Sequence, residues 1–535
     1  MTDLDGLALL DREDLIAMIK RMVNGGVSLS FYGKRTAMEI ARRVRPRVTR
    51  RIKELHVGTP EEQSKNLLIE GENLRAMVTL YKYRGQIDLI VADPPYNTGQ
   101  YFRYNDRWDE DPNDPDLGTL VTLEDGSRHT KWMKAMLPRL QVMKSMLKPQ
   151  GVVAVCIDDN ELFDLGLMMD EVFGEDNRLG IINWQKTTVK NDASHISAVT
   201  EYVLVYAKSK ELAKTSLLPR TEKSNVRFSN PDKDKRGPWK QDNLTAASGN
   251  RKSAYLIQSP FTGELHGPGT RFWANKKSTI KAWLEGWSSE YEEVTLEDDA
   301  PSDLVLKGWR PDADDKNTRI LEAAKARAKA KLEEGNWPVL YFGHDGFGKP
   351  VRKTHEELVK AGAVPLTFWV EDDDKLDPAA IESVSWDSAT SGRSRDGIEE
   401  LTSIVGRGHG FDTVKPLKLI KKIIQLWCPA TGVVMDPYAG SGTTGHAVLE
   451  LNKATGTARR FILIEQGRQD NGDKYARTLT WRRLKNAITG ERPDTSGPLK
   501  KLAEPLGGGF EFRMLTSQID AKTVLSMKKD EHMPS

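Results

Sequence analysis

The chain is short of several features that mark whole classes of protein. It has only two cysteines in 535 residues, Cys156 and Cys428, and both lie among apolar neighbours. This usage indicates buried thiols in a reducing compartment, not a disulfide framework or a cysteine metal site. No run of about 18 apolar residues is present to span a membrane, and the first residues lack the pattern of a secretion signal. These absences favour a cytoplasmic protein without a membrane partner.

The chain also has almost no excess of one sign of charge. Lys and Arg total 79 against 77 Asp and Glu, a net charge of +2, so binding to nucleic acid must be argued from local patches. The densest basic patch lies at 34–53, and a solvated helix face and a phosphate contact explain it equally well. The nine histidines have no metal-ligand spacing, so no metal is predicted. The length predicts two or three domains.

The most informative stretch is Asp93-Pro94-Pro95-Tyr96, which follows an apolar run at 87–92. A strand that stops at two prolines leaves a carboxylate and an aromatic ring at its carboxyl end, where open α/β sheets place their ligand sites. The prolines fix the backbone and remove two N–H donors, so their carbonyls lack local partners. Such a pocket can accept hydrogen bonds from an amino group and stack on its heterocycle. A strand followed by a simple proline-rich turn is the alternative interpretation.

A second stretch, at 432–451, predicts a strand, a glycine-rich turn and the start of a helix. Gly440, Gly442 and Gly445 stand in GxGxxG register. The first two allow a tight turn close to a ligand, and the helix N-terminus offers N–H groups. The next apolar strand ends on Glu465, about 20 residues after Gly445, where an acid can hold a ribose hydroxyl. No P-loop lysine follows the turn, so we expect a dinucleotide or nucleoside site, with a purely structural turn as the alternative.

Together these two stretches resemble the motifs of the amino-methylating DNA methyltransferases that use S-adenosylmethionine. In that family Asp-Pro-Pro-Tyr is the catalytic motif. The segment from Asp436 to Thr444 resembles the cofactor loop, with Tyr438 in place of the family's Phe. The catalytic motif comes first and is separated from the loop by more than half of the chain, an order similar to the permuted β class. The stretch at 411–417 resembles the family's Phe-x-Thr-x-Lys-Pro element, which helps to close the cofactor pocket.

The resemblance implies a role for each residue of these motifs. The Asp93 side chain and the Pro94 carbonyl would accept the N–H groups of the target amine, and Tyr96 would stack on a base flipped out of the duplex. Pro95 completes the catalytic set. The cofactor-binding residues would be Phe411, Thr413, Lys415, Asp436, Tyr438, Gly440, Gly442, Thr443, Thr444 and Glu465. The protein then has mainly to align the amine with the methyl group, because S-adenosylmethionine already carries a good leaving group.

The implied fold class is α/β: a Rossmann-like methyltransferase fold with a mixed seven-stranded sheet, a circularly permuted motif order and a large α+β target-recognition insert. The expected divisions are an N-terminal helical basic region at 1–55, a catalytic half at 56–208, the insert at 209–407, a cofactor-binding half at 408–490, and a C-terminal hairpin and tail at 491–535. The insert holds eight of the 13 tryptophans and resembles the target-recognition region of type III modification subunits. Each tryptophan taken singly is more often core than contact.

Shorter segments carry local predictions. Residues 15–23 have apolar spacing typical of a helix. The acid-rich residues 158–161 follow a buried strand and are predicted to cap the next helix. The stretch at 318–334, rich in Ala, Lys and Arg, predicts a helix. Residues 507–512 resemble a C-terminal hairpin of the type III subunits.

The resemblance implies a site-specific methyltransferase that acts on the N6 amino group of adenine in duplex DNA. N4-cytosine methylation is the nearest alternative, although it more often goes with Ser in the position of Asp93. A subunit that recognises DNA for a separate restriction endonuclease is an alternative from another class, and an RNA methyltransferase is a weaker one. The chain has no helicase or nuclease pattern. The implied partners are double-stranded DNA, a second copy in a homodimer, and a separate helicase-nuclease restriction subunit.

Overall fold

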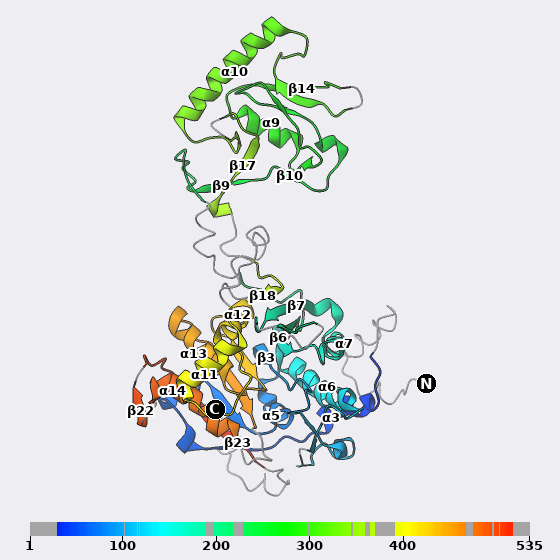
Figure 1. The fold of residues 1–535 in the computed structure, drawn as a ribbon, viewed down its shortest axis with the longest axis vertical. Coiled ribbons are helices and arrows are strands. Elements are labelled where there is room, and N and C mark those ends of the chain that lie inside the picture. The colour runs from blue at the N-terminus through cyan, green and yellow to red at the C-terminus, as the bar shows by residue number, and fades with distance from the viewer. Residues whose placement is uncertain are drawn as a thin grey trace. The chain divides into compact units, whose positions relative to one another are not determined.

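The computed structural model divides the chain into two compact units, each shown in Figure 1. Unit 1 comprises Met1–Leu218 and Val364–Ser535, and unit 2 comprises Pro219–Ala363. The structure describes residues 29–100, 102–114, 116, 118–188, 196–217, 228–297, 300–343, 346–358, 364–369, 391–466, 474–494, 497–501 and 503–516. Among these residues no helix combines the length and the hydrophobicity needed to cross a membrane.

Unit 1 is built on a ten-stranded sheet with the order β1-β23-β2-β20-β19-β3-β6-β8-β7-β18. The strands are β1 Thr49–Arg51, β2 Leu67–Glu70, β3 Ile87–Ala92, β6 Leu147–Ile157, β7 Arg178–Gln185, β8 Thr200–Ala207, β18 Phe368–Trp369, β19 Val433–Asp436, β20 Arg460–Glu465 and β23 Glu511–Leu515. The seven neighbouring strands from β2 to β7 form the mixed sheet that the sequence predicts, in which β8 alone runs antiparallel to its neighbours. Strands β1, β23 and β18 extend its edges and are additional to the seven predicted.

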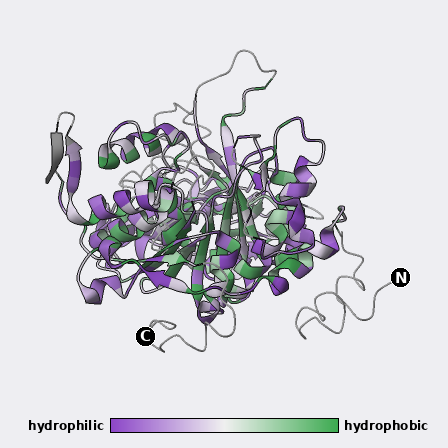
Figure 2. Ribbon diagram, turned by 90° about the horizontal axis from the view of Figure 1, so that it is seen from below, coloured by the Kyte–Doolittle hydropathy of each residue, from purple (hydrophilic) through white to green (hydrophobic). Residues whose placement is uncertain are grey.

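Helices cover both faces of this sheet because alternate strand residues point to opposite sides. In β3, Ile90 belongs to one core, whereas Leu89 and Val91 belong to the other. The first core is covered by α3 (Lys34–Arg43), α5 (Asn73–Thr79), α6 (Arg128–Met146) and α7 (Leu162–Phe173), and the second by α12 (Leu417–Trp427), α13 (Thr443–Thr455) and α14 (Trp481–Thr489). Hydrophobic residues accordingly concentrate in the central strands, and hydrophilic residues are frequent on the surrounding helices (Figure 2).

The sheet brings together segments that lie far apart in the sequence. Strand β19 is the parallel neighbour of both β3 and β20. The three strands therefore end at the same edge, β3 just before Asp93, β19 on Asp436 and β20 on Glu465. Such an edge is where open α/β sheets place their ligands.

Unit 2 has a core of its own and three small sheets, β10-β13, β12-β11-β15-β14 and β16-β17-β9. Its elements are β9 Trp239–Asp242, β10 Thr245–Ala246, β11 Ile257–Gln258, β12 Leu265–His266, β13 Phe272–Trp273, α9 Lys277–Glu285, β14 Tyr291–Val294, β15 Asp303–Leu306, α10 Asp314–Glu334, β16 Leu340–Phe342 and β17 Pro350–His355. Helix α10 confirms the helix predicted at 318–334. Trp239, Trp273 and Trp287 are buried, so these three belong to the core and are not exposed for contact.

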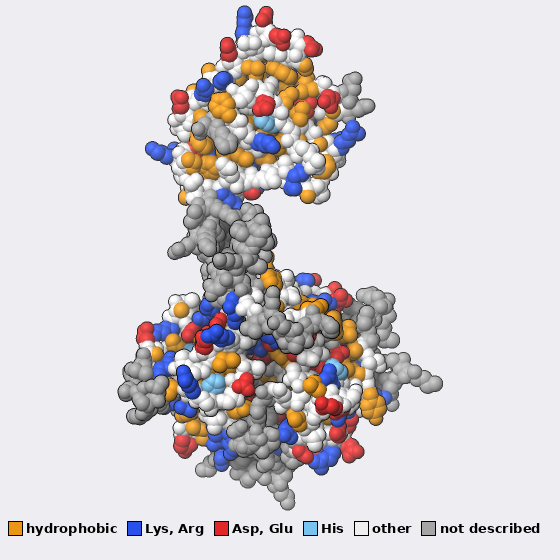
Figure 3. Space-filling model, in the orientation of Figure 1, with side chains coloured by type: hydrophobic (Ala, Val, Ile, Leu, Met, Phe, Trp, Pro, Cys, Tyr) orange, Lys and Arg blue, Asp and Glu red, His pale blue; other side chains and the backbone are white. Residues whose placement is uncertain are grey.

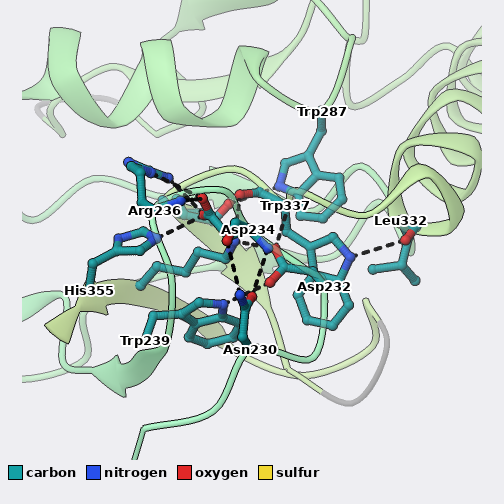
Figure 4. Close-up of polar contacts among 11 residues, drawn as sticks. Asn230, Asp232, Asp234, Arg236, Trp239, Trp287, Leu332, Trp337 and His355 are labelled. Atoms are coloured by element: carbon teal, nitrogen blue, oxygen red, sulfur yellow. Dashed lines mark hydrogen bonds and ion pairs between the residues drawn. The ribbon is translucent and has the colours of Figure 1, made fainter. Parts of the chain in front are cut away.

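A charged network lies inside this core, and Figure 4 shows most of its members. The fully buried Lys353 ammonium contacts the carboxylates of Asp232 and Asp234, the latter at 3.1 Å, and lies 4.9 Å from the centre of the Trp239 ring. Trp239 Nε1 donates to Asp232 Oδ1 at 2.8 Å, and His355 Nε2 lies 2.8 Å from Asp234 Oδ2. Burial alone would raise the pKa of Asp232, but the hydrogen bond from Lys353 holds it below its ordinary value.

Several boundaries differ from those predicted. The helix predicted at 15–23 lies outside the described residues. Strand β1 occupies part of the stretch at 1–55 that was predicted to be helical, and this segment pairs with the sheet of unit 1. Unit 2 is shorter than the predicted insert at 209–407, because β18 and α11 (Ser394–Val405) both belong to unit 1.

The hairpin predicted at 507–512 is wrong. Residues Glu511–Leu515 form β23, which lies between β1 and β2 in the large sheet. The parallel pairing with β2 places Phe512 in the core, fully buried. A hairpin in this part of the chain is formed instead by β21 (Glu491–Asp494) and β22 (Gly497–Lys501).

Candidate active site

A cavity of about 820 Å³ lies at the carboxyl edge of the large sheet. Both motifs line it, although they come from opposite halves of the chain. The predicted residues in its lining are Asp93, Pro94, Pro95, Tyr96, Phe411, Thr413, Lys415, Asp436, Tyr438, Gly440, Thr443, Thr444 and Glu465. Gly442 is outside the lining and forms the N-cap of α13. The fold therefore brings the two predicted sets of residues to one place.

The glycine-rich turn between β19 and α13 is held by hydrogen bonds at its centre. Gly440 N–H donates to Glu465 Oε2 at 2.6 Å, and its carbonyl accepts from the Thr480 hydroxyl at 2.6 Å. Gly442 adopts a left-handed conformation with φ 82°, which glycine reaches without a steric penalty. Glu465, predicted to bind a ribose hydroxyl, thus also ties the end of β20 to the turn. Its ribose contact stays a prediction.

The carboxylate of Asp436 organises the start of the same turn. It accepts from the backbone N–H of Tyr438 at 2.9 Å and from the Thr444 hydroxyl at 2.6 Å. The side chain is buried, and this burial raises the pKa of Asp436 to about 7. The Tyr438 ring, in the position of the family's Phe, packs against the first core. The turn is therefore shaped by its own side chains before any ligand arrives.

A buried arginine that the sequence did not point to supports the turn from α14. Arg483 is fully buried and donates to the hydroxyls of Ser441 and Thr443, at 3.0 and 2.7 Å. Its Nε lies 3.3 Å from His446 Nδ1. Burial lowers the pKa of Arg483 to about 10, and burial together with the Arg483 charge lowers the pKa of His446. His446 is therefore neutral and accepts this hydrogen bond.

Substitution of Gly442 by Ala is expected to weaken cofactor binding by about tenfold, because a left-handed alanine costs about 1–2 kcal/mol and its Cβ would stand 3.1 Å from Thr480 Cγ2. Gly456→Ala is the matched control at the other end of α13. Gly456 has φ 65° and no atom within 4 Å of an added Cβ, so it carries similar strain away from the cavity. Equilibrium binding of labelled S-adenosylmethionine compares the two variants. Equal affinities would contradict a role of this turn in cofactor binding.

Asp93 lies directly after β3 with its side chain 32% exposed. The Tyr96 hydroxyl donates to Asp93 Oδ1 at 2.7 Å, and Lys415 Nζ lies 3.0 and 2.9 Å from the two carboxylate oxygens. Trp132 Nε1 donates to the Pro95 carbonyl at 2.7 Å, so the proline turn is anchored to α6. The carboxylate therefore meets the cavity in a fixed orientation.

Glu201, at the start of β8, joins this cluster as a residue that the sequence did not identify. Its Oε2 lies 3.3 Å from Lys415 Nζ, and its Oε1 lies 3.1 Å from Lys186 Nζ. Burial alone would lower the pKa of Lys415, but the charges of Asp93 and Glu201 raise it above its ordinary value. Lys415, predicted to help close the cofactor pocket, lines the same cavity and has these carboxylates as partners. An acid at the beginning of a strand belongs to no motif, so no pattern in the sequence indicated Glu201.

The acidic segment 158–161 does not cap α7 as predicted. Glu161 is the N-cap residue but makes no side-chain capping bond. Its fully buried carboxyl group instead accepts from Asn97 Nδ2 at 2.5 Å and lies 2.7 Å from His129 Nδ1. His129, Glu161 and Asp164 place ligand atoms within 4.8 Å of one another. Burial raises the pKa of Glu161 to about 8, which favours a hydrogen-bonded carboxylic acid, and Glu161 thus holds the residue that follows Tyr96.

Stability is expected to fall as pH rises from about 4.5 toward about 8, because Glu161 is protonated in the folded chain over this range and ionised in the unfolded one. The protonated form contributes stability below the ordinary pKa, and that contribution is lost as pH rises through the folded value. Glu161→Gln should reduce the total loss of unfolding free energy over this pH range by about 2–4 kcal/mol. Urea unfolding at several pH values measures it, with Glu211→Gln at an exposed position as control. An unchanged slope would show that Glu161 is ionised in the folded state.

Comparison with known proteins gives the family. Residues 87–470 match the model of the N6/N4 DNA methylase family. The Mod subunit of the StyLTI type III restriction-modification enzyme of Salmonella typhimurium is 30% identical over 466 residues, covering 84% of this chain and 60% of that protein. The EcoPI Mod subunit of Escherichia phage P1 is 27% identical, covering 79% and 61%. The type II methyltransferase M.KpnI of Klebsiella pneumoniae is also 27% identical, covering 77% and 83%.

This chain belongs to the N6/N4 DNA methylase family. Within the family it is similar to the Mod subunits of type III restriction-modification enzymes, and it spans about three fifths of the length of those relatives. Two solved structures align with low scores. They are PvuII DNA methyltransferase, cytosine-N4-specific (TM-score 0.34, 11% identity, covering 80% of this chain and 89% of that one), and M1.HpyAVI with SAM (0.30, 14%, 78% and 98%).

Proposed function

We propose that this protein is a site-specific DNA methyltransferase that transfers a methyl group from S-adenosylmethionine to the N6 amino group of adenine in duplex DNA. The observation that carries the proposal is the meeting of the two family motifs in one cavity. Asp93 directly follows β3, and Asp436 ends the neighbouring parallel strand β19. An acceptor for an amine therefore stands beside a glycine-rich turn suited to a nucleoside. A dehydrogenase would account for the turn but not for the Asp-Pro-Pro-Tyr motif.

The residues of the cavity fit S-adenosylmethionine. The turn at 436–444 places backbone N–H groups at the start of α13, where anionic groups bind favourably. Glu465 ends β20 with a carboxylate that can accept from ribose hydroxyls. Phe411 adds an aromatic side chain to the wall of the cavity. A Cβ added at Gly440 would lie 3.4 Å from the Phe411 ring, so any residue larger than glycine at position 440 would narrow the cavity. We assign these residues to the cofactor, together with Thr413 and the remaining predicted positions of the turn.

The chain's own contribution to the reaction is alignment of the amine. When bound, the cofactor supplies a methyl group on a sulfonium sulfur, and the thioether that remains after transfer is a good leaving group. The exocyclic amine is a poor nucleophile because its lone pair is conjugated into the ring. Acceptance of its N–H groups by the Asp93 carboxylate and the Pro94 carbonyl would favour tetrahedral geometry at nitrogen and localise that lone pair. Such alignment can contribute roughly 7–11 kcal/mol in favourable cases, and Tyr96 would hold the flipped base by stacking.

Unit 2 is the proposed target-recognition part. In the sequence it lies between the two motifs. Its face seen in Figure 3 carries Lys and Arg side chains among acidic and hydrophobic ones. Phosphate contacts position a protein on DNA, and side chains in the grooves read the bases. The basic patch at 34–53 is a second candidate. Part of it serves the fold, since Lys34 pairs with Glu171 at 2.7 Å. Its exposed members include Arg42, Arg45 and Arg50.

Two further points belong to the proposal. The likeness to type III Mod subunits supports a separate restriction subunit as a partner. We also propose a homodimer and a cytoplasmic location, which are expectations for this family. N4-cytosine methylation is the second candidate, because the family includes both reactions. Asp in the first position of the catalytic motif favours adenine.

The purified protein is incubated with unmethylated genomic DNA and labelled S-adenosylmethionine, and the modified nucleoside is identified by mass spectrometry. N6-methyladenine is the expected product. N4-methylcytosine would keep the mechanism and change the target base. Cofactor binding without any labelled base would contradict the proposal. The chain would then either recognise DNA for a partner nuclease or methylate RNA. Comparing DNA cleavage with and without a co-purifying subunit separates these.

A further inference from the structure

Asp93, the proposed acceptor of the target amine, already has an ammonium as its partner. Lys415 Nζ lies 3.0 and 2.9 Å from its two carboxylate oxygens, and the Tyr96 hydroxyl donates to one of them at 2.7 Å. A charge-assisted hydrogen bond is roughly twice as strong as one between neutral groups. A neutral amino group therefore competes poorly for Asp93 unless the ammonium has another acceptor to turn to.

Glu201 provides that second acceptor. Its Oε2 lies 3.3 Å from Lys415 Nζ and 3.3 Å from the Tyr96 hydroxyl. The side chains of Lys415 and Glu201 are each only 10% exposed, so water does not easily replace a carboxylate as partner. The Tyr96 and Trp184 rings stand 5.0 and 5.9 Å from the ammonium. The ammonium can therefore shift between the two carboxylates while remaining in an enclosed site.

Lys186 keeps Glu201 ready for this exchange. Its Nζ lies 3.1 Å from Glu201 Oε1, which leaves Oε2 directed to Lys415. Burial alone would raise the pKa of Glu201, but the charges of Lys415 and Lys186 hold it below its ordinary value. Glu201 is therefore a carboxylate with one oxygen committed to Lys186 and the other available to Lys415. Two acidic and two basic side chains balance one another in the cluster.

We propose that the Lys415 ammonium passes from Asp93 to Glu201 when the target amino group enters, so that Glu201 is a positioning residue that makes Asp93 available. This inference deepens the methyltransferase function proposed above and rests on it. The exchange leaves no buried charge without a partner, which is the condition for moving an ion in such a site. Without DNA, the same ammonium keeps the acceptor occupied.

A double-mutant cycle on Glu201→Gln and Lys415→Met tests the exchange. The rate of single-turnover methyl transfer to unmethylated genomic DNA is measured with labelled S-adenosylmethionine, and cofactor affinity is measured by equilibrium binding. Glu201→Gln keeps the ammonium on Asp93, so it should slow transfer by about tenfold or more and leave cofactor affinity within about twofold. In the K415M background no ammonium competes, and the same Gln substitution should slow transfer by less than about threefold.

Two single variants complete the design. Lys415→Met should retain at least about a tenth of the wild-type rate, since Lys186 still neutralises Glu201 and Asp93 is open to the amine. Glu201→Asp should recover most of the rate lost in Glu201→Gln, because it keeps the carboxylate, and it decides the matter if the Gln variant fails to bind cofactor.

Equal effects of Glu201→Gln in both backgrounds would overturn the exchange. So would a Lys415→Met variant as inactive as one lacking the Asp93 carboxylate, or a Glu201→Asp variant as slow as Glu201→Gln. In each case wild-type transfer would still stand. A wild-type protein that methylates no DNA would instead overturn the proposed function itself.

Discussion

Substitution of Asp93 by Asn is expected to slow methyl transfer by about a thousandfold, with cofactor affinity within about twofold of wild type. The amide keeps the size of the carboxylate but presents an NH₂ donor toward the amine and leaves Lys415 without one of its two acidic partners. The glycine-rich turn is untouched, since its own contacts run through Asp436 and Glu465. Single-turnover transfer with labelled S-adenosylmethionine measures the rate, and equilibrium binding measures the affinity.

Asp159→Asn is the matched control for this experiment. Asp159 follows the neighbouring strand β6 and is exposed, so the same change of charge occurs at the same edge of the sheet without touching Asp93. Its rate should equal that of the wild type. If the Asp93 variant also transferred at the wild-type rate, Asp93 would not be the acceptor of the target amine.

Substitution of Lys353 by Met is expected to destabilise unit 2 by about 3–5 kcal/mol. The change leaves Asp232 and Asp234, both labelled in Figure 4, buried without the ammonium that both contact. Unit 1 has its own cores, so cofactor affinity should stay near the wild-type value while DNA binding is lost. Urea unfolding followed by tryptophan fluorescence should show the unit 2 transition at a lower urea concentration than that of unit 1, since the cores of both units contain buried tryptophans.

Lys307→Met provides the comparison within the same unit. Lys307 pairs with Glu290 at 2.5 Å, but both side chains are largely exposed, and exposed pairs of this kind contribute little. Its unfolding curve should match the wild type. A Lys353 variant that lost cofactor binding along with the unit 2 transition would show that the two units unfold together.

The sequence predicted the central strands and the two motifs because each signal is local. The run before Asp93 is apolar and fully buried as β3, and the turn before α13 needs glycine where φ is positive, as at Gly442. Because β3 and β19 are parallel neighbours, the motifs that follow them meet at one edge of the sheet. Short edge strands such as β1 and β18 lack this signal. They contain three and two residues and are strands only because a neighbouring strand offers pairing.

The residues that the sequence missed act through tertiary contact. Arg483 is an ordinary residue of an amphipathic helix until packing places it under Ser441 and Thr443. Glu201 belongs to no motif. Its role depends on its contact with Lys415, which is more than 200 residues away in the sequence. The segment at 158–161 was predicted to cap a helix because acids are common at helix N-caps. In the structure, Glu161 instead accepts a hydrogen bond from the buried side chain of Asn97.

The place where unit 2 interrupts the chain bears on how such proteins diversify. All ten strands of the large sheet come from outside Pro219–Ala363, so no strand pairing that holds the cavity depends on that segment. One contiguous stretch of the gene can therefore be exchanged between relatives in a single recombination event while the cavity is inherited intact. Under the target-recognition role proposed for unit 2, such an exchange would alter the DNA sequence that is recognised. Selection for new recognition and selection to preserve the chemistry would then act on separate parts of one polypeptide.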